Sequence, residues 1–174
     1  MSTTLHVNVL SKQSINMAIR RINEYQKEVE SKTIELAQKL AERGAEIARI
    51  KVMEFGGFNS GEMYSGIGGY FSPTLNMGLV KVTSDHAAFF EFGTGPRGSA
   101  SPHPNGGVSY KGEGWWTAAD GKDMEMMYGW LPITLKNGDI IYYTEGQEAK
   151  PFMYETAQEL GRQFEQIAKE VFAK

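Results

Sequence analysis

The chain of 174 residues contains no cysteine, which excludes disulfide bonds and thiolate metal sites. It has only three histidines, widely separated and without the His-Glu-x-x-His spacing of zinc peptidases. No stretch approaches the roughly 18 consecutive apolar residues of a membrane-spanning helix, and the N-terminus lacks the pattern of a signal peptide. We therefore expect no cofactor and no membrane contact, and a reducing compartment such as the cytoplasm or a virion assembled there.

Motifs for covalent chemistry are also missing. The chain has no Gly-x-Ser-x-Gly nucleophile motif and no calcium-binding loop. One alternative stays open, in which Glu91 with Asp85 or Glu145 forms a glycosidase pair. In this alternative the protein is a small hydrolase or a carbohydrate-binding module that uses Glu91, Trp115 and Trp116. Scattered surface acids are far commoner than such pairs, so we expect no enzyme activity.

The overall composition favours one soluble domain over residues 1–174. Hydrophobic residues make up 41% and aromatic residues 11% of the chain, which is enough for a sizeable core. The net charge of −3 arises from 18 basic and 21 acidic residues, and this balance does not predict binding to nucleic acid.

Two long segments have the period of amphipathic helices. The first runs from Ile15 to about Glu54, with Ser11 or Ser14 as the N-cap and Gly56-Gly57 at its end. Its apolar residues recur every seven positions, which fits either a coiled coil or, as we expect, a helix lying across a sheet. The second helix is predicted from Phe152 or Met153 to Phe172.

Short strands are predicted between the two helices. Residues 75–82 and 86–92 read as one antiparallel hairpin, and residues 133–135 and 139–144 as another with an Asn-Gly turn. Residues 3–10 could add a further short strand. The predicted fold is α+β, with the N-terminal and C-terminal helices packed on a small antiparallel sheet. Residues 93–130 form a long loop rich in Gly, Pro and Trp, expected to be mobile when the subunit is alone.

A contact edge is predicted where the strand over 86–92 ends. The aromatic run carries one acid, Glu91, and stops at Gly93-Thr94-Gly95-Pro96, which predicts a turn. Glu91 and Thr94 should point outward at the rim of the sheet, whereas Phe92 should be buried. The candidate contact residues are Glu91, Phe92, Gly93, Thr94, Gly95, Pro96, Trp115, Trp116, Pro151 and Phe152, with Phe152 also expected to anchor the core.

Three segments together resemble a known family. They are residues 59–67, residues 87–95 with the end Glu-Phe-Gly-Thr-Gly, and residues 143–153 with Pro-Phe-Met before the last helix. They are similar to the head–tail joining, or tail-completion, proteins of long-tailed bacteriophages and prophages, and the similarity covers roughly residues 13–170. The departures are Met63 in place of leucine, an inserted Gly66, His86 in place of tyrosine and a longer segment after Gly98.

The resemblance implies a structural role in the virion. Identical subunits would form a ring at the neck, between the portal or connector of the capsid and the tail tube or tail terminator. DNA would only pass through the ring, and the protein would lie in the host cytoplasm during assembly. A tail-terminator or minor tail ring protein is the alternative within this class.

Overall fold

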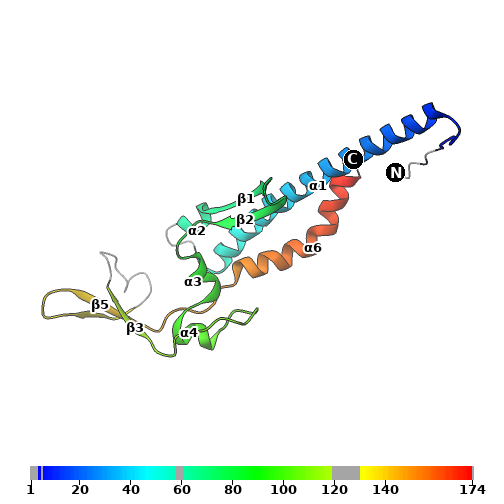
Figure 1. The fold of residues 1–174 in the computed structure, drawn as a ribbon. Coiled ribbons are helices and arrows are strands. Elements are labelled where there is room, and N and C mark those ends of the chain that lie inside the picture. Colours follow the sequence, from blue (N-terminus) through cyan, green and yellow to red (C-terminus); the bar gives the residue numbers. More distant parts are fainter. Residues whose placement is uncertain (1–3, 5, 58–60, 119–129, 174) are drawn as a thin grey trace.

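The computed structural model describes residue 4 and residues 6–57, 61–118 and 130–173. Figure 1 shows two long helices that lie side by side, with short helices and two small antiparallel sheets beside and beyond them. The elements in chain order are α1 (Lys12–Glu54), α2 (Glu62–Ser65), β1 (Ile67–Ser72), β2 (Met77–Val82), α3 (Ala87–Phe92), α4 (Gly95–Ala100), β3 (Trp115–Ala118), β4 (Pro132–Thr134), β5 (Ile140–Thr144) and α6 (Phe152–Phe172). This confirms the α+β class and both long helices.

Helix α1 begins and ends at the residues that the sequence indicates. The Ser11 hydroxyl accepts a hydrogen bond from the backbone N–H of Ser14, as an N-cap does. At the other end Gly56 has φ 73°, and the N–H groups of Gly56 and Gly57 bond back to the carbonyls of Met53 and Val52. This is the Schellman motif, in which these N–H groups satisfy carbonyl groups of the last turn that have no partner within the helix.

Helix α6 and the first hairpin cover only the C-terminal half of α1, and Ala18 is the one buried residue among the first 22 residues of the helix. Helix α6 runs antiparallel to α1, because Lys51 pairs with Glu155 and Arg43 bonds to Gln163. That register brings the end of α6 close to residue 34. The hairpin of β1 and β2 packs on the same half of α1. Residues 12–33, about 33 Å of helix, therefore extend beyond the rest of the fold, as the blue end of α1 shows in Figure 1.

The core lies where α1, α2, α3, the hairpin and the start of α6 meet. Its residues are Ala45, Ala48, Val52, Met63, Ile67, Phe90 and Phe152. The small residues of α1 allow close packing. Gly44 is one of them, and a Cβ there would meet Val80 and Leu160, so hairpin and α6 both approach α1 at this position. No helix within the described residues is long and apolar enough to cross a membrane.

The strand predicted over 86–92 is wrong, since Ala87–Phe92 forms helix α3. Phe90 and Glu91 are buried next to one another, whereas Phe89 and Phe92 are exposed. A strand would instead alternate its faces. The β-rich composition of this run is overridden by tertiary packing, which decides such short apolar segments. The first hairpin is consequently β1 with β2, joined through residues 73–76.

The predicted loop over 93–130 is partly regular. It contains α4 and strand β3, and β3 pairs with β5 in a second sheet of order β3-β5-β4. Residues 119–129 of the predicted loop lie outside the described residues. The predicted hairpin of β4 and β5 is confirmed, but its turn has three residues, with Gly138 at φ 89°. The described part of residues 3–10 contains no strand.

The adjacent glycines of β1 offer a matched test of this packing. A Cβ at Gly69 would overlap the backbone carbonyl of Ala41 in α1, whereas a Cβ at Gly68 would meet nothing. Gly69→Ala should therefore push the hairpin off α1 and lower the free energy of unfolding by about 1–3 kcal/mol. Gly68→Ala should change it by less than about 1 kcal/mol. Urea denaturation measures both, and equal effects would argue against the close hairpin–helix contact.

Candidate functional site

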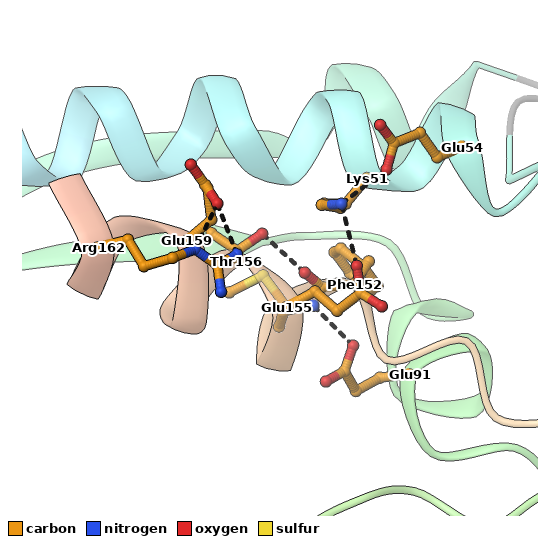
Figure 2. Close-up of polar contacts among 9 residues, drawn as sticks. Lys51, Glu54, Glu91, Phe152, Glu155, Thr156, Glu159 and Arg162 are labelled. Carbon is orange, nitrogen blue, oxygen red and sulfur yellow. Dashed lines mark hydrogen bonds and ion pairs between the residues drawn. The ribbon is translucent and has the colours of Figure 1, made fainter.

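The acid that the sequence places at an exposed rim is buried. Glu91 is only 6% exposed, and its two carboxylate oxygens accept hydrogen bonds from the backbone N–H groups of Met153 (2.8 Å) and Tyr154 (3.0 Å). These N–H groups belong to the first turn of α6, where a helix has unpaired donors and a partial positive charge. Figure 2 shows Glu91 directed from α3 toward this turn. Glu91 thus caps α6 from a distant part of the chain.

A histidine that the sequence did not single out completes this cap. His103 is 3% exposed, and its Nε2 lies 3.0 Å from Glu91 Oε1. Its Nδ1 accepts a hydrogen bond from the N–H of Asn105, so Nε2 carries the ring proton and donates to Glu91. The rings of Phe92 and Tyr154 both contact the imidazole, with centroids 4.8 Å and 5.6 Å from it. No spacing rule links His103 to Glu91, and only the folded chain brings them together.

The Gly93–Pro96 segment is joined to the chain before α6 instead of forming an open strand edge. Thr94 exchanges two backbone hydrogen bonds with Gln147, and its hydroxyl accepts a further one from the Gln147 N–H. Gly93 and Gly95 are buried with φ of 72° and 61°, and a Cβ on either would overlap the backbone of residues 145–149. Pro96 stands in the first turn of α4. The prediction of an outward-facing Gly-Thr-Gly edge is therefore wrong.

The two tryptophans of β3 project from opposite faces of its sheet, as successive strand residues do. Trp116 is 51% exposed and packs against Tyr143 of the neighbouring strand. Trp115 is half-buried, with the ammonium group of Lys111 above its ring at 5.5 Å. A single aromatic platform made of both rings is therefore not formed.

An apolar groove opens beside this junction. It has a volume of about 570 Å³, and its walls carry the side chains of Phe89, Phe92, Tyr110 and Trp115 around the Gly93–Gly95 backbone. Tyr110 is held in place by its hydroxyl, which donates to the Phe92 carbonyl and accepts from the His103 N–H. Phe89 is 57% exposed and Phe92 40% exposed, so the prediction of a buried Phe92 is wrong.

The remaining two candidates lie at the start of α6. Pro151 stands at the N-cap position, which agrees with its expected place at the entry of the helix. Phe152 is completely buried, and its ring meets that of Phe90 edge to face at 5.9 Å. Its predicted role as a core anchor is confirmed. Because its side chain is completely buried, Phe152 is not accessible to a partner.

Lys51 connects α1 to the same first turn of α6, as Figure 2 shows. Its ammonium group bonds to Glu54 at 2.8 Å and to Glu155 at 3.0 Å, and these two carboxylates raise the pKa of Lys51 above 10.5. A raised pKa means that the charged form stabilises the fold. This contribution is complete below the unfolded pKa and disappears as the pH rises through the higher folded pKa.

Lys51→Met should therefore destabilise the fold at pH 7 by less than about 1 kcal/mol, since the pair is partly exposed. The difference from the unchanged protein should shrink as the pH rises above 10.5. Thermal unfolding at pH 7 and at strongly alkaline pH measures this difference. A gap that widens with rising pH would contradict the assigned pairing.

Comparisons with protein-family models, with curated proteins and with solved structures found no match. Among the described residues, no group of three or more His, Asp or Glu side chains has a metal-binding arrangement. The site is thus a junction that holds α3, α4, residues 145–149 and α6 together, with an apolar groove on its outer side.

Proposed function

We propose that this protein is a structural component of the neck of a long-tailed bacteriophage or prophage, forming a ring between the capsid portal or connector and the tail tube. The observation that carries the proposal is the contact between two segments of the family resemblance. The Glu91–Gly95 segment and the Pro151–Phe152 segment meet through Glu91 and the first turn of α6, 62 residues along the chain. Two of the segments that carry the resemblance are therefore in direct contact in the folded chain.

The buried candidate contact residues stabilise the fold of each subunit and do not touch a neighbouring subunit in the ring. Glu91, Gly93, Gly95 and Phe152 are enclosed within one subunit, so direct contacts to a neighbour fall to exposed residues. A ring repeats one heterologous contact, which needs two different surfaces on each subunit. The groove at Phe89 supplies one such surface.

The second surface is the sheet of β3, β5 and β4, which projects from the body near the groove (Figure 1). Its strands and their flanks expose large apolar side chains, among them Trp116, Leu131, Ile133, Ile140 and Tyr143. Apolar surface of this extent on a small projecting sheet is typical of a protein contact. In the ring, this sheet of one subunit lies against the groove of the next.

Electron microscopy of lysates from the parent phage with this gene deleted tests the proposal. Filled heads beside free tails are the expected result. Tails of abnormal length would assign the protein to the tail terminator instead. Intact infectious particles would contradict both roles and favour a ligand for the aromatic groove, such as a carbohydrate.

Complementation of the deletion tests the contact surface itself. Phe89→Asp should fold, because Phe89 is 57% exposed, but should leave heads and tails unjoined. Lys81→Asp places the same carboxylate on an exposed position of β2, away from the groove, and should restore joined particles. Restoration by both variants would remove the groove from the proposed contact.

A further inference from the structure

The chain contains the dipeptide Asn-Gly twice, at Asn105-Gly106 and at Asn137-Gly138. In this dipeptide the backbone nitrogen of glycine can attack the side-chain carbonyl carbon of asparagine, because glycine has no Cβ to hinder the approach. The new C–N bond closes a succinimide ring, and the side-chain amide leaves as ammonia together with the proton of the glycine N–H. Water then opens the ring at either carbonyl, which gives aspartate or isoaspartate. The net reaction consumes water and exchanges an amide for a carboxylate.

The two sites have the same backbone arrangement. Gly106 and Gly138 both have positive φ, at 64° and 89°. Each glycine N–H donates to the carbonyl three residues earlier, to His103 at 3.0 Å and to Leu135 at 2.9 Å. Both asparagines are exposed, and a Cβ on either glycine would meet nothing within 4 Å. A difference in reactivity between the two sites must therefore come from the asparagine side chains and their surroundings.

The side chain of Asn137 is held on both of its polar atoms. Its Nδ2 donates to Asp139 Oδ2 at 2.7 Å, and its Oδ1 accepts from the Asp139 N–H at 3.2 Å. Both bonds must break before the side chain can turn toward the Gly138 nitrogen. The Asp139 carboxylate also disfavours the negative charge that develops on this nitrogen when its proton leaves.

The side chain of Asn105 has no such restraint. Asn105 donates its backbone N–H to His103 Nδ1, but its side chain makes no hydrogen bond within the described part of the chain. The nearest acid in the sequence is Glu113, eight residues away. The Asn105 amide is therefore free to reach the geometry of attack by the Gly106 nitrogen.

We propose that Asn105 is a site of spontaneous deamidation in the folded protein, and that Asp139 protects Asn137 from the same reaction. The two hydrogen bonds to Asp139 lower the reactive fraction of Asn137 at least about tenfold relative to Asn105. The sequence treats the two dipeptides alike, and only the folded chain distinguishes them.

The modification would act on the junction described above. Isoaspartate adds one carbon atom to the main chain at position 105, between His103 and Tyr110. His103 donates to the buried Glu91 carboxylate, and Tyr110 forms part of the groove wall. Deamidation thus lengthens the segment that connects the cap of α6 to the groove. This inference does not depend on the neck proposal, because it concerns the chemistry of the isolated subunit.

Incubation of the folded full-length chain at mildly alkaline pH, followed by tryptic peptide mapping with mass spectrometry, tests the proposal. Lys111 and Lys136 lie between the two sites, so each asparagine falls in its own peptide. In the folded protein Asn105 should convert at least about tenfold faster than Asn137. In concentrated urea, where the contacts of Asp139 are lost, the two should convert at similar rates. Equal rates in the folded protein, or conversion of Asn105 only in urea, would overturn the proposal.

The protective role of Asp139 is tested by its removal. Asp139→Ala should speed the conversion of Asn137 in the folded protein and leave the rate at Asn105 unchanged. Asp85→Ala removes an exposed aspartate elsewhere on the surface and should change neither rate. If Asp139→Ala leaves the rate at Asn137 unchanged, the bonds to Asp139 do not protect this residue and the proposal fails in that part.

Discussion

Replacing Glu91 with alanine is expected to lower the free energy of unfolding by about 3–5 kcal/mol, as does removal of one partner from a buried, charged hydrogen-bond network. The carboxylate receives three hydrogen bonds, two from the first turn of α6 and one from His103. Its removal would leave these donors buried without acceptors. Chemical denaturation followed by circular dichroism measures the loss.

Two further variants give this prediction its controls. Glu91→Gln keeps the size of the side chain but replaces one acceptor oxygen with a donor amide, so it should lose about 1–3 kcal/mol. Glu148→Ala removes an exposed glutamate from the segment before α6, whose backbone lies against Gly93, and should change stability by less than about 0.5 kcal/mol. A Glu91→Ala protein as stable as Glu148→Ala would refute the capping role.

Phe152→Ala is the second change with a large expected effect, a loss of about 3–5 kcal/mol. The ring is completely buried between α1 and α3 and belongs to the central cluster with Val52 and Phe90. Its removal leaves a cavity at the point where α6 joins the body, and the small residues of α1 cannot fill it. Urea denaturation and the midpoint of thermal unfolding both report the loss.

Phe92→Ala is the matched control, because it deletes the same ring from a partly exposed position. Phe92 is 40% exposed and lies against the His103 ring at 4.8 Å, so about 1–2 kcal/mol should be lost. The sequence alone predicts that Phe92 is buried like Phe152, and therefore that the two losses are of similar size. Equal losses for the two variants would count against the assignment of the core.

The long helices were predictable because their signals are local. The Ser11 cap, the Gly56-Gly57 stop and Pro151 before α6 each act within one turn, and the apolar period runs through many residues. The hairpin of β4 and β5 was found for the same reason. Its turn type differs because Gly138, and not Asn137, takes the left-handed conformation.

The junction was not predictable, because its determinants lie far apart in the chain. Residues 87–92 have the composition of a strand, yet they become helix α3 because Glu91 reaches the start of α6 and Phe90 reaches the core. His103 joins through a hydrogen bond that no motif anticipates. The glycines and Pro96 indicated a turn after Glu91, but the composition of the run predicted that this turn lies at an outer edge, whereas Thr94 is bonded to Gln147.

The antiparallel contact between α1 and α6 has a consequence for synthesis of the protein on the ribosome. Arg43 and its partner Gln163 are separated by 120 residues, so α1 leaves the ribosome long before the helix that covers it. Until α6 emerges, the small-residue face of α1 and the Glu91 carboxylate have only part of their native contacts. Folding of the core is therefore expected to wait for release of the C-terminal helix, and nascent chains stalled before it should remain sensitive to protease.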